Sequence, residues 1–396
     1  MLEKTKYVIL RSREIIVPTT ENLGTRGAAR ILNLDPQELE IEETQLNHSQ
    51  RIDLRRDPRT RAIAPAFPLK LIKPIESQEE VTSTASSTWG INAVGANNSP
   101  FDGSDITVAV LDTGIDPEHP AFAEVDLVQR NFTTESDNDL NGHGTHCAGT
   151  IFGKDVDDTR IGIARNIKRA LIGKVLGAGG GSSATIAQAI QWAVDEGAHV
   201  VSMSLGIDFP GYVKYLIEVE DLPTEAATSI ALEGYRANVN LFTELFDFIQ
   251  AQGLFGRGAI IVAASGNESE RPRYEVSVAP PAAGTGIIAV GALQESSNGF
   301  SVANFSNDQV NISAPGVDVI SAKVGGGLRS LSGTSMATPH VAGIAALWAQ
   351  RQLNTTGRID NQILTSQLIA SGILDTLAPG YEIDNVGAGI VQAPQS

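Results

Sequence analysis

Five nearly continuous apolar runs place the strongest constraint on how this chain can fold. They are ITVAVLD (106–112), RALIGKVL (169–176), HVVSMSL (199–205), AIIVAAS (259–265) and GIIAVGAL (286–293). Strands that are apolar along their whole length are buried on both faces, and such strands are usually parallel. Helical patterns stand between them, at 183–197 and 238–253. This alternation predicts a doubly wound, mostly parallel α/β sheet with helices on both faces.

The first 85 residues have a different pattern. Residues 6–11, 38–46 and 69–75 are predicted to form short strands, and residues 26–33 a helix. Residues 75–88 (IESQEEVTSTASST) are polar and lack periodicity, which indicates an exposed linker. We therefore expect a small α+β domain in residues 1–85, followed by the larger α/β domain in residues 86–396.

The charge of the chain limits its partners. There are 29 Lys and Arg residues against 46 Asp and Glu, a net charge of −17. Residues 1–85 hold thirteen of each sign, so the whole excess lies in residues 86–396. An acidic domain repels nucleic acid and anionic membranes, so we expect it to bind neither.

The start of the chain and its cysteine content favour a cytoplasmic protein. The first twenty residues scatter charges among apolar residues, unlike the apolar core of a signal peptide. No apolar run reaches the length of a membrane span. Cys147 is the sole cysteine, so no disulfide can form within the chain. A signal peptide removed ahead of this sequence would make the protein secreted instead.

Ser335 stands in LSGTSMATPHVAG (331–343), between a glycine-rich approach and a helical run. Serine is favoured where a helix begins, because its oxygen accepts a hydrogen bond from an unpaired backbone N–H. A capping role alone would therefore explain it. A nucleophilic role needs a base, a group that orients the base, and donors for an oxyanion.

The chain supplies a candidate for each of these roles. Asp112 ends the run 106–112, and the carboxyl ends of parallel strands are where doubly wound folds build their sites. The base is His143 or His146, which are three residues apart in LNGHGTHCAGT (140–150), and this spacing does not choose between them. Asn267 follows the run 259–265 and can donate its amide to an oxyanion, as can the Ser335 N–H. His119 and His340 stand beside prolines, and we expect both to be structural.

Four stretches together resemble the subtilisin-like serine proteases, or subtilases: DTGID (112–116), GHGTHCAG (142–149), SGN (265–267) and GTSMATPHVAG (333–343). The resemblance spans about three quarters of the chain, from Trp89 to about residue 393. It implies a serine endopeptidase that hydrolyses peptide bonds through an acyl-enzyme intermediate. Within that resemblance Asp112 orients His143, His143 is the general base, and Ser335 is the nucleophile, in the family's chain order. Asn267 and the Ser335 N–H hold the oxyanion.

The resemblance also implies where a polypeptide substrate binds. The substrate would lie as an added strand between two edge segments, and a third segment would complete the pocket before the scissile bond. These residues are Gly179, Gly180, Gly181, Ser204, Leu205, Gly206, Ala264, Ser265 and Gly266. Because the walls offer no counter-ion, we expect an apolar or medium-sized residue before the scissile bond.

Residues 1–85 have the length of a subtilase prosegment, an intramolecular inhibitor. We expect them to send the linker 75–88 through the cleft and to block the site until the chain cuts itself between about Ile75 and Ser87. A permanent accessory domain is the alternative.

The sequence departs from the family pattern at two places. The chemistry implied by the resemblance needs no cofactor, and a structural calcium fits the family. However, Ala121 and Phe122 stand where an acidic calcium ligand is common, and KDVDDTR (154–160) lacks the usual calcium-loop pattern, so no metal ligand is assigned. Residues 207–237 form an insertion beside the cleft, predicted to be either a lid or specificity element or a mere excursion.

Two other functions stay open. A transpeptidase or macrocyclase would use the same acyl-enzyme but would release it to an amine. A non-catalytic peptide-binding module would use the cleft alone. The complete set of Asp, His, Asn and Ser motifs argues against the module.

Overall fold

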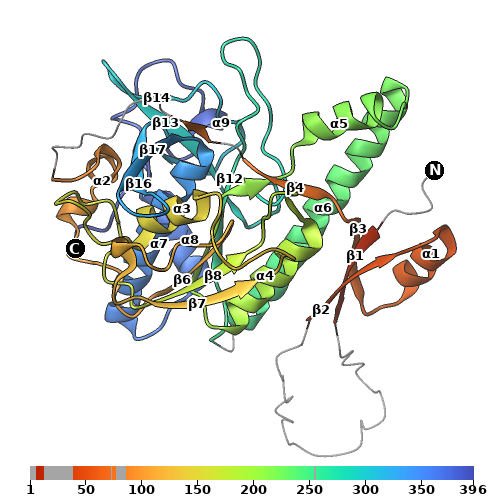
Figure 1. Cartoon of the computed structure of the whole chain (residues 1–396), viewed down its shortest axis with the longest axis horizontal. Helices are drawn as coiled ribbons and strands as arrows, with labels where there is room; N and C mark the ends of the chain where they lie inside the picture. The colour runs from red at the N-terminus through yellow and green to blue at the C-terminus, as the bar shows by residue number, and fades with distance from the viewer. Residues whose placement is uncertain (1–5, 13–38, 73, 77–85, 254–255) are drawn as a thin grey trace, which may run out of the picture.

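The central sheet of the computed structural model has eight strands, seven of them in the order β14-β13-β12-β10-β6-β8-β7, with β15 paired to β13 (Figure 1). All its pairs are parallel except that of β13 with β14. The five predicted apolar strands all lie in this sheet, and the predicted α/β fold is confirmed. The bounds are β6 Thr107–Asp112, β7 Asp126–Asn131, β8 Arg169–Lys174, β10 Val200–Met203, β12 Ile260–Ala264, β13 Ile288–Ser296, β14 Gly299–Val302 and β15 Ile312–Pro315.

The structure describes residues 6–12, 39–72, 74–76, 86–253 and 256–396. The predicted helix at 26–33 and most of the predicted linker lie outside these residues.

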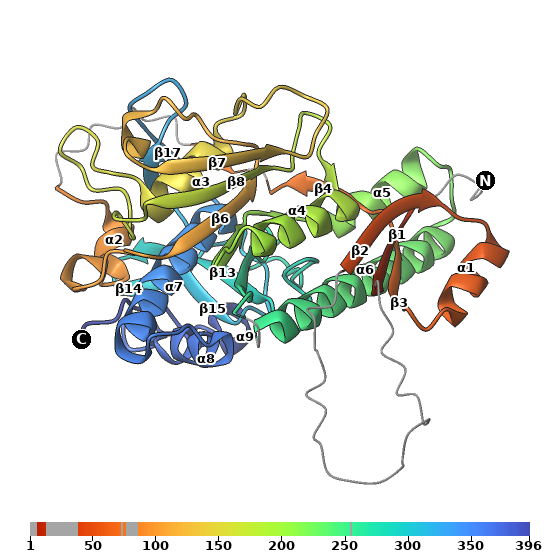
Figure 2. The ribbon, with the colours of Figure 1, turned by 90° about the horizontal axis from the view of Figure 1, so that it is seen from below.

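Helices cover both faces of the sheet (Figure 2). Successive side chains of a strand point to opposite faces. Val108 and Val110 of β6 therefore belong to one core, and Ala109 and Leu111 to the other. The first core includes α3 (His143–Phe152), α7 (Thr334–Thr356) and α8 (Asn361–Ala370), and the second α4 (Ser183–Asp195) and α6 (Thr224–Gln252). Burial on both faces explains why the runs do not alternate with polar residues.

In its described residues, the N-terminal unit is a three-stranded antiparallel sheet with one helix. Its strands are β1 (Lys6–Ser12), β2 (Leu39–Gln45) and β3 (Thr60–Pro65), in the order β2-β1-β3. Figure 2 shows this sheet beside α4 and α6, and its buried residues share the core of those helices. The helix α1 (His48–Arg56) and β3 were not predicted. Helix α1 has no buried residue and so no apolar stripe, although the Asn47–Gln50 capping box marks its start.

Residues 207–237 form a helical hairpin. Helix α5 (Phe209–Glu218) leads into α6, which begins at Thr224 and so well before the predicted helix at 238–253. The two helices share a small core of Leu216, Ala227 and Ala231. We call Asp208, α5 and the first half of α6 the hairpin.

The remaining elements are short. They are β4 (Pro68–Leu71), β5 (Ile75–Glu76), α2 (Trp89–Ala93), η1 (Ala96–Asn98), η2 (Pro120–Phe122), β9 (Gly181–Ser182), β11 (Leu205–Gly206), β16 (Val319–Ala322), β17 (Leu328–Ser332) and α9 (Ile383–Val386). Among the helices in the described ranges, none combines the length and the apolar character needed to cross a bilayer.

Candidate active site

Asp112 and His143 form a buried pair at the carboxyl end of the sheet. Asp112 is the last residue of β6 and His143 the first of α3, and 2.8 Å separates Asp112 Oδ1 from His143 Nδ1. Both residues are almost fully buried. Burial lowers the pKa of His143, but the charge of Asp112 and its hydrogen bond raise it more, so that the pKa lies well above its ordinary value. Bonding at Nδ1 leaves Nε2 to exchange a proton.

The other candidate histidines bind main-chain carbonyls. His146 Nε2 lies 3.0 Å from Val319 O, and burial lowers the pKa of His146 to about 3. His119 Nε2 and His340 Nδ1 likewise lie 2.9 and 2.8 Å from the carbonyls of Gly327 and Met336. The geometry therefore selects His143 as the partner of Asp112, and the other three hold main chain in place.

Ser335 lies in the first turn of α7 and is fully buried. The N-cap position belongs to Gly333, and no side chain caps this helix, so a capping role for Ser335 is wrong. Its Oγ lies 3.2 Å from Ser204 O and 3.3 Å from Ile72 O, the two acceptors it can donate to. His143 Nε2 has no hydrogen-bond partner within the described part of the chain. Catalytic hydrogen bonds often form only when a substrate is fully engaged.

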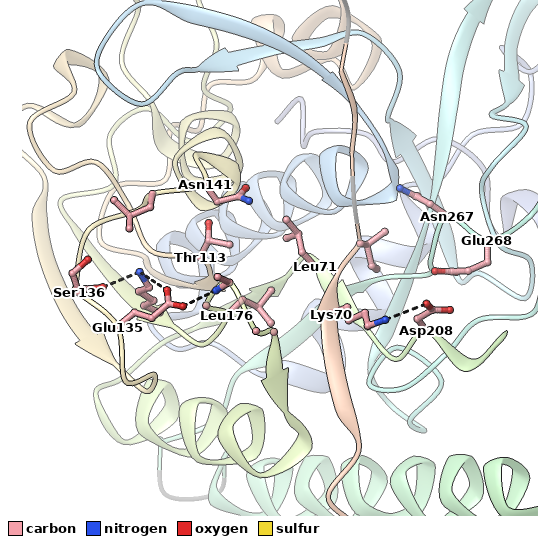
Figure 3. Close-up of a pocket in the computed structure, with 18 residues that line it drawn as sticks. Lys70, Leu71, Thr113, Glu135, Ser136, Asn141, Leu176, Asp208, Asn267 and Glu268 are labelled. Atoms are coloured by element: carbon pink, nitrogen blue, oxygen red, sulfur yellow. Dashed lines mark hydrogen bonds and ion pairs between the residues drawn. The ribbon is translucent and has the colours of Figure 1, made fainter. Parts of the chain in front are cut away.

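Asn267 lies in the loop after β12 and lines the cavity at this end of the sheet. Its Oδ1 accepts hydrogen bonds from the N–H and Oγ1 of Thr334, both at 2.9 Å. These two bonds fix which side of the amide carries the NH₂ group. In Figure 3 Asn267 lies across the cleft from Thr113 and Asn141. The amide is therefore held rigidly beside the start of α7, next to Ser335.

Asp139 joins the two elements that carry Asp112 and His143, and the sequence analysis missed it. Its buried carboxylate accepts hydrogen bonds from Thr113 Oγ1, from the N–H groups of Asn141 and Gly142, and from both N and Oγ1 of Thr145. The distances run from 2.7 to 3.1 Å. An Asp just ahead of a helix start is a recognisable signal, because its side chain can satisfy unpaired N–H groups. Asp139 thus ties the end of β6 to the start of α3.

Cys147 fills the space behind the pair. Its Sγ lies 3.8 Å from His143 Nδ1 and 3.5 Å from Ser335 O, so it touches both residues. Burial raises the pKa of its thiol, which favours the neutral, unreactive form. Within the described ranges Asp112, His143 and Cys147 are the one group close enough to share a metal ion. Asp112 and His143 bond to each other through Oδ1 and Nδ1, and the thiol of Cys147 is kept in its neutral form, so no metal is assigned.

We expect Cys147→Ala to keep activity within about threefold of wild type, because a neutral thiol only packs here. It should lower the free energy of unfolding by about 1 kcal/mol through lost contacts. Covalent labelling of Ser335 by a fluorophosphonate measures the chemistry directly. Labelling that disappears in Cys147→Ala but persists in Ser335→Ala would identify the thiol as the nucleophile.

A segment of the N-terminal unit lies in the predicted substrate position. On one side of β4, Leu69 pairs with Gly181; on the other side, Leu71 pairs with Leu205 and Lys70 with Gly206. Figure 3 shows this strand crossing a cavity of about 820 Å³. The predicted occupant was the linker 75–88, but residues 77–85 lie outside the described part of the chain. The start of the linker, Ile75 and Glu76, forms β5 and pairs with Ser332 and Leu331 of β17 rather than with β9 and β11. Within residues 68–72 the side chains of Leu69 and Ile72 are buried, whereas Lys70 is exposed.

The predicted binding segments surround this strand. Gly180 has φ +85°, and a Cβ there would lie 2.5 Å from Leu69 O, so only glycine allows the close approach. Ile72 is buried and its side chain lies against Gly206. Gly179 and Gly206 line the cavity beside the strand. Ala264 and Ser265 are buried where β12 ends, and Gly266 follows with φ +119°.

The fold and the site together define an α/β protein with a buried Asp–His pair next to a helix-borne serine, an arrangement typical of serine hydrolases. Comparison with known protein families matches residues 103–385 to the Subtilase family. The chain belongs to the subtilase family of serine endopeptidases.

Its relatives include several named proteases. A thermostable alkaline protease of Halalkalibacterium halodurans is 32% identical over 356 residues, which cover 88% of this chain and 83% of the relative. An alkaline protease of Alkalihalobacillus alcalophilus is 35% identical over 357 residues, covering 88% and 82%. An intracellular serine protease of Paenibacillus polymyxa is 30% identical over 295 residues, covering 73% and 79%. The similarity therefore reaches into the N-terminal unit.

Proposed function

We propose that this protein hydrolyses peptide bonds with Ser335 as nucleophile, His143 as general base and acid, and Asp112 as the group that orients the imidazole. The observation that carries the proposal is the Ile72 carbonyl oxygen, 3.3 Å from Ser335 Oγ, in a strand bound as a substrate would be. Cys147 touches both His143 and Ser335, which makes the base and the nucleophile neighbours.

The steps follow from this arrangement. Ser335 Oγ attacks the carbonyl carbon while His143 takes its proton at Nε2. The tetrahedral intermediate collapses, the C–N bond breaks, and His143 gives the proton to the leaving amine. His143 then takes a proton from a water molecule, which attacks the acyl carbon. The bond to Ser335 Oγ breaks, the carboxylic acid product leaves, and His143 returns the proton to Ser335. Subtilases need no cofactor for this chemistry, and a structural calcium stays a prediction without assigned ligands.

We propose Asn267 and the Ser335 N–H as donors to the oxyanion. Asn267→Ala should therefore lower kcat by about 10²–10³-fold with little change in KM, because the amide acts on the transition state. Steady-state kinetics on one peptide measures both constants. A change confined to KM would mean that Asn267 only shapes its loop. Asn304→Ala, in another loop, is the matched control.

Residues 1–72 are proposed to be the inhibitory prosegment. The carbonyl beside the nucleophile belongs to Ile72, so we move the proposed self-cleavage from the range between Ile75 and Ser87 to the Ile72–Lys73 bond. Ile72 also matches the expected apolar residue before the scissile bond. Lys70 Nζ lies 3.8 Å from an Asp208 carboxylate oxygen, which favours a basic residue two positions earlier.

The test of the proposed function follows the acyl-enzyme. The protein is incubated with an extended peptide and a competing amine, and the products are weighed by mass spectrometry. We expect products with free carboxylates and labelling of Ser335 by a fluorophosphonate. Amine-capped products in excess would identify a transpeptidase, and absent labelling of the folded protein a binding module. The hairpin contacts the strand ahead of Ile72, on the side away from the leaving amine, so its position gives no support to transpeptidation.

A cytoplasmic location also stays a proposal. It is supported by the name of the Paenibacillus polymyxa relative, an intracellular serine protease. Fractionation of the native host with an antibody to this chain would test it, and recovery from the culture medium would refute it.

A further inference from the structure

We propose that the hairpin adds a pocket to the substrate groove, and that this pocket takes an aromatic side chain at the sixth position before the scissile bond. The proposal rests on the proposed function, which makes Ile72–Lys73 the scissile bond. Ile72 is therefore the first position before that bond, and the other positions are counted back from it. The residue at the sixth position in the bound strand is Phe67. Two segments contact Phe67. The start of α4 hydrogen-bonds its main chain, and the hairpin packs against its ring.

The groove holds the backbone beyond the strand pairing of β4. The Phe67 N–H donates to Ser183 Oγ at 3.1 Å, and the Ser183 N–H donates to Phe67 O at 3.1 Å. Ser183 is the first residue of α4, so its N–H has no partner within the helix. Both bonds use only main-chain atoms of Phe67. Any peptide with a non-proline residue at the sixth position can make them.

The hairpin supplies the walls around the ring. Phe67 is 2% exposed, and its ring centroid lies 4.3 Å from that of Tyr212 on α5. A Cβ at position 234 of α6 would lie 2.3 Å from Phe67 Cε2, so Gly234 leaves the room that the ring occupies. Glycine is disfavoured inside a helix, and Gly234 has no left-handed φ that would require it. The contact with the ring is what explains a glycine at this place.

Both walls belong to the insertion. Tyr212 and Gly234 lie within residues 207–237, and Tyr212 also packs on the hairpin's own core. Asp208, which caps the start of α5, is the residue that pairs with Lys70. The hairpin therefore contacts the bound strand at its third and sixth positions. Once the prosegment leaves, the same walls face an incoming peptide, so the insertion is a specificity element rather than an excursion.

The experiment compares two chromogenic anilides with the sequences Phe-Pro-Leu-Lys-Leu-Ile and Ala-Pro-Leu-Lys-Leu-Ile, both cut after Ile. The enzyme is the purified full chain after any self-processing. Wild type should prefer the Phe peptide about tenfold in kcat/KM, mostly through KM, because burying a phenyl ring adds binding at a place remote from the chemistry. In Gly234→Ala the added methyl fills the pocket, and the preference should fall to about one.

Glu233→Ala is the matched control, since Glu233 is exposed on the same turn of α6 and should keep the wild-type preference. Equal rates on both peptides in wild type, or a preference that survives Gly234→Ala, would overturn the pocket. Hydrolysis of neither peptide, together with no labelling of Ser335, would instead refute the proposed function.

A second readout does not depend on cleavage. In the full-length Ser335→Ala chain the strand 67–72 should stay in the groove, and its amides exchange hydrogen only when it opens. Adding Gly234→Ala should speed exchange at Phe67 and Leu69 by at least about tenfold, because the ring no longer fits. Unchanged exchange would mean that Gly234 makes no room for the ring, and the proposal would fail.

Discussion

Ser335→Ala is expected to stay a single chain of 396 residues, whereas wild type separates into residues 1–72 and 73–396. The variant should also lose about 10⁶-fold in peptide turnover, the size of loss found when another subtilase loses its catalytic serine. The reason is geometric: Ser335 Oγ lies 3.3 Å from the Ile72 carbonyl oxygen, and the strand that carries Ile72 is paired on both edges. Intact-mass spectrometry of both proteins measures the cut to the residue.

The control is Ser330→Ala, which removes a hydroxyl from β17, five residues before Ser335. It should process like wild type. Thermal unfolding of Ser335→Ala should show a cooperative transition, because alanine is well tolerated in a helix. Trimming of Ser335→Ala at the same bond would assign the cut to another protease. A wild-type cut between Ile75 and Ser87 would mean that β4 slides in the groove before it is cleaved.

The fold of the large domain could be predicted because its strands are buried on both faces. A short apolar run such as 259–265, bounded by glycines, is typical of a buried strand, and β12 lies within it. The N-terminal unit was harder to predict. Its strand β1 is largely buried, but β2 has no buried residue, β3 is buried at two positions, and α1 buries nothing. The hairpin was hidden for a related reason: residues 224–237 share few contacts with the main core, so their apolar pattern is weak.

The site could be predicted only as far as short motifs reach. Asp112, His143, Asn267 and Ser335 each stand in a recognisable stretch. The structure brings them close together: Asp112 bonds to His143, Cys147 contacts both His143 and Ser335, and Asn267 bonds to Thr334 beside Ser335. Local sequence cannot show which distant segment lies between β9 and β11, because strand pairing depends on the register of the folded chain. A prediction from sequence therefore puts the linker in the cleft, where residues 68–72 lie.

Asp112→Asn is expected to lower kcat/KM about 10⁴-fold near neutral pH and to shift its pH dependence. The asparagine can turn its NH₂ group toward His143 Nδ1, and the imidazole proton then moves to Nε2, the atom that must accept the proton of Ser335. Turning the NH₂ group toward His143 breaks the bond from the Thr113 N–H, which in wild type donates at 2.7 Å to the same oxygen that bonds His143, Asp112 Oδ1. Where the amide oxygen stays in that place, the tautomer is kept, but the negative charge that stabilises the protonated imidazole is lost.

The pH profile separates loss of this charge from simple misfolding. In wild type Asp112 raises the pKa of His143 well above its ordinary value, and only the neutral imidazole can accept a proton. Activity should therefore be low at pH values below that raised pKa and should rise as the pH increases through it. Without the charge, burial is the largest remaining influence on His143 and lowers its pKa, while Cys147 still acts to raise it, so the residual activity of Asp112→Asn should rise at a lower pH than that of wild type. Asp126→Asn, which changes an exposed carboxylate on β7, should leave the profile in place. A profile that stays unshifted in Asp112→Asn would show that Asp112 does not set the charge state of the base, and the orienting role would pass to another group that holds α3, with Asp139 the first to test.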